Sequence, residues 1–257
     1  MLRRSQFPMG QHFKLSVHQA PRSEVEINEK QKLPYASMIG SIMYAMISTR
    51  PDIAQAVSIT SSFMSNHGKE HWLALKWLMR YMKGASDIGI LFDGANEVCG
   101  DALVGWSDSD FAGNIDTRRS QSGYVFTLYG AAVSWKSSLQ SVVALSTTEA
   151  EFMALTAAVK ESYWLRGILK DFGVVQESVA VGCDNNSALC VSKHQVYHER
   201  SKHIDVHLHF IREKIDEGEV KVFKVDTTEN PADMLTKPVS RSKLGSCMKL
   251  VSLCKIC

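Results

Sequence analysis

The sequence predicts an α/β fold in which a small helical segment precedes a mixed five-stranded sheet with helices on both faces. Two observations lead to this prediction. Apolar residues recur at helical spacing between about residues 34 and 83, and then at every second position from residue 98. After that change, three successive strand patterns are followed by helix, strand, helix, strand and helix, an order typical of a mixed sheet covered on both sides.

The helical segment is expected to hold three short helices. The first begins after Pro34 and carries apolar residues on one side. The second opens with Pro51 and has an acid, Asp52, in its first turn, both typical of a helix start, and it is expected to continue through Met64. The third spans about residues 69–83. We interpret the methionines and aromatic residues of these helices as core.

Strands and helices are expected to follow from residue 98 onward. The strands are predicted at residues 102–106, 123–128, 132–135 with a continuation at 142–145, 179–182 and 220–225. A long helix is expected to be capped by Ser146 or Thr147 and to end near Gly173. Shorter helices are predicted at residues 186–192, 203–217 and 231–236.

The composition allows a sizeable core and gives no sign of a membrane protein. The 257 residues are 45% hydrophobic, and the longest apolar-rich stretch, residues 38–48, is about half of the roughly 20 residues that a membrane span needs. No secretory signal is visible, and the six cysteines are too scattered for a disulfide scaffold, so we expect reduced thiols in an intracellular protein.

The formal net charge of +2 hides an asymmetry between the two parts of the chain. Residues 1–96 hold eleven Lys/Arg against seven Asp/Glu, whereas residues 97–257 hold eighteen against twenty. The second part is therefore not a generic basic module for nucleic acids. To bind a phosphate backbone it would need metal ions and local arginines, with longer-range attraction from the basic first part.

Four acidic residues lie where a strand is expected to end or a helix to begin. They are Asp108, Glu151, Asp184 and Asp233. Side chains at element ends can meet at one edge of a sheet, and carboxylates brought together repel one another unless cations lie between them. Hard oxygen ligands suit Mg²⁺ or Mn²⁺, so the pattern predicts a site for two such ions and the chemistry of a two-metal nuclease.

Ordered motifs along most of the chain resemble those of one family. They include Thr49-Arg50-Pro51-Asp52-Ile53, His71-Trp72, Trp106-Ser107-Asp108-Ser109-Asp110, Ser146-Thr147-Thr148-Glu149-Ala150-Glu151, Cys183-Asp184-Asn185, Lys202-His203-Ile204-Asp205 and Ala232-Asp233-Met234-Leu235-Thr236-Lys237. From about residue 8 to residue 240 the chain is similar to the C-terminal part of a copia-type retrotransposon Pol polyprotein. That part comprises the last, thumb-like helices of the reverse transcriptase and the ribonuclease H domain.

The resemblance implies four regions and an activity. The regions are a linker or severed polymerase segment (1–32), a helical thumb or connection remnant (33–96), a ribonuclease H-like domain (97–240) and a C-terminal tail (241–257). The implied activity is hydrolysis of the RNA strand of RNA–DNA hybrids, with Asp108, Glu151, Asp184 and Asp233 as the catalytic, metal-binding residues. No polymerase activity is expected, because the adjacent aspartates of the polymerase palm are missing and the chain begins after that site.

The resemblance also implies where the protein acts and what it meets. We expect the RNA–DNA hybrid as its partner, with other Pol segments as further partners, no membrane, and a location in a cytoplasmic particle or the nucleus. The second hypothesis is a non-catalytic remnant of the element, which folds and binds nucleic acid or protein without turnover.

Two of the four carboxylates have neighbours that compete for the same role. Asp110 is the alternative to Asp108, although it lies two residues beyond the expected strand end. Glu149 is the alternative to Glu151; it is better placed to interact with the helix dipole, whereas the residues after Glu151 match the ribonuclease H pattern better. We therefore predict Asp108 and Glu151.

Six residues are candidates for contact with the nucleic acid. Basic residues near strand ends fit phosphates, and polar residues beside the carboxylates fit the 2′-hydroxyl that marks the RNA strand. The six are Arg118, Arg119, Lys136, Ser146, Thr147 and Asn185.

The histidines of the predicted helix 203–217 have no assigned role. The i, i+4 spacing of His203 and His207 would allow zinc binding, but a solvated helix surface that also carries His209 is the better interpretation. Residues 226–230 lack the histidine that other ribonuclease H lineages carry before the last carboxylate.

Overall fold

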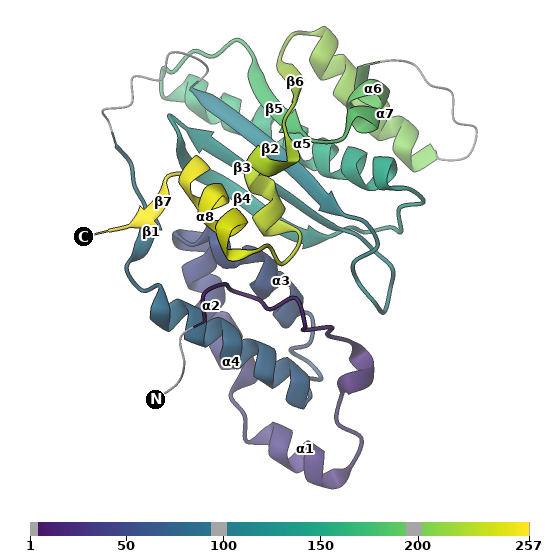
Figure 1. Ribbon diagram of the computed structural model, residues 1–257. Helices are drawn as coiled ribbons and strands as arrows, with labels where there is room; N and C mark the ends of the chain where they lie inside the picture. Colours follow the sequence, from purple (N-terminus) through teal and green to yellow (C-terminus); the bar gives the residue numbers. More distant parts are fainter. Residues whose placement is uncertain (1–4, 94–101, 194–201, 257) are drawn as a thin grey trace.

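The computed structural model describes residues 5–93, 102–193 and 202–256 (Figure 1). The predicted change of pattern near residue 98 lies outside these residues. No described helix combines the length and the apolar character that crossing a membrane requires.

A mixed five-stranded sheet forms the centre of the second part of the chain, as predicted. Its strands are β2 (Leu103–Asp110), β3 (Gln121–Leu128), β4 (Ala131–Leu139), β5 (Val179–Cys183) and β6 (Val220–Lys224). Their order is β4-β3-β2-β5-β6. The strands β4, β3 and β2 pair antiparallel, whereas β5 runs parallel to β2, and β6 runs parallel to β5.

Two strands differ from the prediction. The strand β2 continues past Asp108 to Asp110, because β3 pairs with it along its whole length, and Gly123 lies opposite Asp108. The strand β4 runs without interruption to Leu139, and residues 142–145, which we expected to continue it, form a loop. Leu139 already pairs with the first residue of β3, so the β-branched residues that follow have no strand to pair with.

Helices cover both faces of the sheet, as predicted (Figure 1). On one face α5 (Thr147–Asp171), α6 (Asn186–Lys193) and α7 (Lys202–Asp216) pack over a core that includes Phe126 and Phe152. On the other face α3 (Ala54–Ser61) and the 3-10 helix η4 (Pro231–Leu235) meet the alternate side chains of the same strands, among them Val125 and Ala132.

The first part of the chain is helical, as predicted from Pro34 onward, and two further helices lie within residues 1–32, which we expected to be a linker or severed polymerase segment. Its helices are η1 (Val17–Gln19), α1 (Glu24–Gln31), α2 (Tyr35–Ser48), η2 (Pro51–Ile53), α3 and α4 (Lys69–Gly84), where η marks a 3-10 helix. The second predicted helix ends at Ser61, before Met64. A buried ion pair fixes the corner after α2: the Asp52 carboxylate accepts hydrogen bonds from Arg50 Nε at 2.8 Å and from the Tyr81 hydroxyl at 2.6 Å.

The end of the chain returns to the first part. The helix α8 (Arg241–Leu250) is followed by β7 (Leu253–Lys255), which pairs antiparallel with β1 (Ile88–Ile90) (Figure 1). Leu244 and Val251 are buried in the core that also contains Leu75 and Leu78 of α4, and Met9 and Leu15 are buried there too. The division of the chain at residues 32, 96 and 240 stays a prediction, but one hydrophobic core continues across all three positions.

Candidate active site

The end of β5 sets the position of the site. The last paired residues of β2 and β5 are Ser107 and Cys183. Asp108 and Asp184, which follow them, therefore lie side by side although β2 itself continues. Together with Asp233 of η4 they bring three carboxylate oxygens within 4.8 Å of one another. Asp108 and Asp233 are buried, whereas Asp184 is partly exposed.

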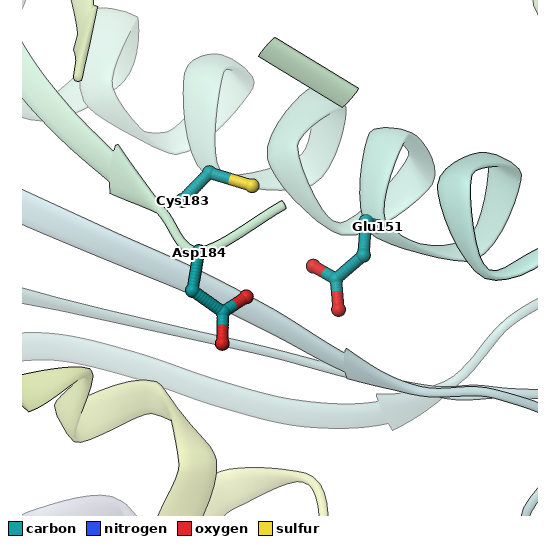
Figure 2. Close-up of side chains that lie close together, drawn as sticks. All are labelled: Glu151, Cys183 and Asp184. Atoms are coloured by element: carbon teal, nitrogen blue, oxygen red, sulfur yellow. The ribbon is translucent and has the colours of Figure 1, made fainter. Parts of the chain in front are cut away.

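Glu151 reaches the same place from α5. Its carboxylate faces that of Asp184 (Figure 2), and one oxygen of each lies within 4.8 Å of the other and of the Cys183 sulfur. The side chain is 7% exposed. Its Oε1 accepts a hydrogen bond from the Ser109 amide at 3.3 Å, but its buried Oε2 has no hydrogen-bond partner among the described residues.

Two features hold η4 and its Asp233 against the strands. The Asn230 side chain donates a hydrogen bond to the Ser107 carbonyl of β2 at 3.0 Å, and it accepts one from the Ala232 amide at 3.1 Å. It therefore links η4 to β2 and also caps η4. Gly123 leaves room for η4, because a side chain there would come within 2.7 Å of Leu235 and 2.9 Å of Thr236. Thr236 is thereby placed to donate a hydrogen bond to Asp108 Oδ2.

Two lysines that our sequence reasoning gave no role reach the cluster. Lys237 Nζ lies 2.7 Å from Asp233 Oδ1 and 3.4 Å from Asp108 Oδ2. Lys243 of α8 lies 3.0 Å from Asp233 Oδ2. The only sequence signal was the position of Lys237, four residues after Asp233 in a motif we had noted.

Burial and mutual repulsion keep two of the carboxyls from ionising easily. Burial, assisted by the charges of Asp233 and Asp184, raises the pKa of Asp108 to about 7 even though Lys237 opposes the shift. Burial together with the charges of Asp108 and Asp184 raises the pKa of Glu151 to about 8. The two groups titrate as a set, because each charge affects the other.

The metal-free protein is expected to lose stability as the pH rises through neutrality. Both pKa values are higher in the folded state than the ordinary 3.8 and 4.5 of Asp and Glu, so the folded state binds more protons. The resulting stabilisation is complete below about pH 4 and lost as the pH passes about 7 and 8. Unfolding temperatures measured in EDTA should show this fall, and the double variant Asp108→Asn/Glu151→Gln should flatten it. A stability that rises across this window would contradict the geometry.

The donor set fits a hard divalent cation. Carboxylate oxygens from Asp108, Glu151, Asp184 and Asp233 are the ligands that Mg²⁺ and Mn²⁺ prefer. The unpaired, buried oxygen of Glu151 provides a direct ligand position. Burial raises the pKa of the Cys183 thiol to about 12, so this sulfur stays protonated and is a poor metal ligand.

The structure separates the four predicted carboxylates from their two competitors. Asp110 accepts a hydrogen bond from the Gln121 amide at 3.0 Å and lies outside the cluster of oxygens. Glu149 accepts one from the Leu145 amide at 2.8 Å, at the start of α5. Asp108 and Glu151, which we predicted, are the members brought together.

The six predicted nucleic-acid contacts fall into two groups. Ser146 and Asn185 cap α5 and α6, accepting hydrogen bonds from the amides of Glu149 and Ala188, and Thr147 is exposed beside Ser146. Ser146 and Thr147 open the helix that carries Glu151, and Asn185 directly follows Asp184 in the chain. The others lie on the surface of the β2–β3 loop and of β4, and no described ion pair joins them to the cluster; they are Arg118, Arg119 and Lys136.

The helix predicted to carry three histidines is α7. His209 is exposed on it, whereas the side chains of His203 and His207 lie outside the described part of the structure. Their role stays open. Residues 226–230 form η3 (Thr227–Glu229), another 3-10 helix, and the carbonyl of Thr227 accepts a hydrogen bond from Lys243.

Comparisons with known proteins place these residues among retrotransposon sequences. The chain is 48% identical over 246 residues to the retrovirus-related Pol polyprotein from transposon TNT 1-94 of Nicotiana tabacum, an alignment that covers 96% of this chain and 18% of that protein. It is 33% identical over 254 residues to the corresponding polyprotein from transposon RE2 of Arabidopsis thaliana, covering 97% of this chain and 16% of that protein. The chain thus spans less than a fifth of the length of these relatives. No family model matches.

Among solved structures, the chain is similar to LC11-RNase H1 in complex with an RNA/DNA hybrid. The similarity covers 52% of this chain and 93% of that one, with 18% identity and a TM-score of 0.38.

Proposed function

The chain belongs, over almost all of its length, with one segment of the Pol polyproteins of copia-type retrotransposons, and we propose that this segment is a metal-dependent endonuclease that hydrolyses the RNA strand of RNA–DNA hybrids. The observation that supports this proposal most is that four carboxylates, from β2, α5, η4 and the residue after β5, form two overlapping groups at one edge of the sheet. Acidic side chains that are buried close together repel one another unless cations lie between them. Asp184, a member of the cluster, is partly exposed, so a substrate can reach the carboxylates from solvent.

Each carboxylate has a part in the proposed chemistry. Asp108, Glu151, Asp184 and Asp233 would hold two Mg²⁺ or Mn²⁺ ions at the scissile phosphate. When bound, such ions activate a water for attack on phosphorus and stabilise the charge on the leaving 3′ oxygen. Asp108 is fixed by Thr236, and Glu151 by the Ser109 amide, so these ligands are oriented before substrate arrives.

Selection of the RNA strand is assigned to the residues that flank the carboxylates. The Ser146 hydroxyl uses a lone pair as a helix cap, and its O–H can still donate. Asn185 uses its Oδ1 as a cap, and its amide NH₂ group can still donate. We assign these groups, together with Thr147, to contact with a 2′-hydroxyl, and Arg118, Arg119 and Lys136 to contact with phosphates further along the duplex.

The experiment that tests the proposal is cleavage of a labelled RNA–DNA hybrid by the purified chain. We expect Mg²⁺-dependent cuts in the RNA strand, none in DNA duplex or RNA duplex of the same sequence, and full inhibition by EDTA. A DNA primer on a template should not be extended. Equal cleavage of all three duplexes would refute hybrid specificity, and no cleavage of any duplex would refute the nuclease.

Divalent ions are also expected to stabilise the fold. A ligand that binds only the folded state at about a hundred times its Kd adds about 2.7 kcal/mol, which corresponds to an increase in Tm of roughly 5–10 °C for a chain of this size. Melting curves with Mg²⁺, Mn²⁺ and EDTA measure this increase. An unfolding temperature indifferent to both ions would show that the carboxylates do not hold metal.

A non-catalytic protein that binds nucleic acid is the alternative. It is favoured by the two ammonium groups on Asp233, because they neutralise part of the cluster without metal. Hybrid binding with no cleavage and no response of the unfolding temperature to divalent ions would favour this alternative.

A further inference from the structure

The carboxylate cluster already holds protein cations on one side. Both oxygens of Asp233 are paired, Oδ1 with Lys237 at 2.7 Å and Oδ2 with Lys243 at 3.0 Å. Lys237 also lies 3.4 Å from Asp108 Oδ2, so one ammonium group bridges two of the four acids. A lysine side chain is positively charged at neutral pH, so this bridge between the two acids is a cation.

On the opposite side of the cluster, the part of the chain that the structure describes shows no such partner. Within the described residues, no Lys or Arg forms an ion pair with the carboxylate of Glu151 or Asp184. Lys224 donates a hydrogen bond to the backbone carbonyl of Asp184, not to its carboxylate. Glu151 Oε2 is buried and unpaired. Among the described residues, lysines thus pair with the cluster on its Asp233 side and not on its Glu151 side.

This asymmetry bears on the number of metal ions. A lysine ammonium is a compact charge that relieves repulsion between two carboxylates as a cation does, but it cannot bind further oxygen ligands. A divalent ion entering between Asp108 and Asp233 would have to displace Lys237. An ion at Glu151 and Asp184 displaces no described lysine or arginine from a carboxylate, and it gains a buried, unused ligand oxygen.

We propose that Lys237 takes the place of one of the two cations, so that the protein without nucleic acid holds a single divalent ion, on the Glu151–Asp184 side of the cluster. This inference rests on the proposed metal-dependent function. It makes Lys237 a positioning residue that acts through Asp108 and Asp233, and it assigns a second ion, if hydrolysis uses one, to the complex with substrate.

The test counts ions in the free protein. Calorimetric titration of the metal-free chain with Mn²⁺ is expected to give one ion per wild-type chain and two per Lys237→Met chain. The spin coupling of two neighbouring Mn²⁺ ions should broaden the electron paramagnetic resonance spectrum of the variant alone. Loss of a nearby positive charge should also tighten the first ion by roughly tenfold. A purely structural role of Lys237 would leave the ion count unchanged.

Lys243→Met is the matched control, because Lys243 contacts Asp233 but not Asp108. It should keep one ion. If Lys237→Met does not fold, Lys237→Gln removes the same charge with a polar side chain and serves in its place. Two ions on the wild-type chain, or one ion on both Lys237 variants, would overturn the inference. The absence of Mn²⁺ binding from every chain would instead refute the proposed function.

Discussion

Replacement of Asp184 by asparagine is expected to slow cleavage of an RNA–DNA hybrid by about a thousand-fold or more. Asp184 belongs to both groups of neighbouring oxygens, so it joins Glu151 to Asp108 and Asp233. Metal ions contribute several kcal/mol of charge stabilisation to such a transition state, and about 1.4 kcal/mol corresponds to a factor of ten in rate. The amide keeps the shape of the side chain but removes the charge that attracts the ions.

Single-turnover rates on a labelled hybrid measure this effect. Asp171→Asn provides the matched control, because Asp171 is exposed at the end of α5 and undergoes the same chemical change. The unfolding temperature of metal-free Asp184→Asn should equal or exceed that of the wild type, since one repelling charge is gone. If the variant kept more than about a tenth of the wild-type rate, Asp184 would not be a metal ligand in the reaction.

The largest effect on stability is expected from Asp52→Ala, at about 3–5 kcal/mol. Asp52 is 2% exposed and binds Arg50 through two nitrogens, at 2.8 and 2.7 Å, as well as the Tyr81 hydroxyl. Arg50 is also buried, and it donates to the carbonyl of Ala85 at 2.8 Å. Removal of the carboxylate therefore leaves a guanidinium charge in the core without its counterion.

Denaturant unfolding followed by circular dichroism tests this prediction, with Glu29→Ala, an exposed acid of α1, as the control. The double variant Arg50→Met/Asp52→Ala is the sharper comparison. It removes both charges, so it should lose less stability than Asp52→Ala alone. A loss below about 1 kcal/mol in Asp52→Ala would mean that water reaches Arg50 and that this corner is not a closed core.

The carboxylates could be predicted from the sequence because the residues around each of them form short, local patterns. Asp184 follows a short apolar run, and Glu151 lies just after a capping serine; both signals need only a few neighbouring residues. We predicted Asp108 to lie near the others because we expected its strand to end there. That reason was wrong, since β2 continues to Asp110. What puts Asp108 beside Asp184 is the end of β5, and only the pairing register shows that.

The lysines and the short strands could not be found in the same way. Whether Lys237 and Lys243 point toward Asp233 depends on how η4 and α8 pack on the sheet, and no spacing in the sequence determines that packing. The strands β1 and β7 have three residues each, too few for a period to be visible. Residues 142–145 have the composition of a strand, but the described part of the chain has no neighbouring strand to pair with them. They form a loop despite their β-propensity.

The return of α8 and β7 to the first helices has a consequence for how the protein is made. A ribosome releases α4 long before Leu244 and Val251, yet these residues complete the core that contains Leu75 and Leu78. Until they emerge, the nascent helices keep an apolar side open to chaperones or to aggregation. A premature stop codon just after Lys237 would preserve every codon for the four carboxylates and still deprive the earliest helices of their closing contacts. In a decaying genomic copy, an intact set of acidic codons is therefore no guarantee of a folded product.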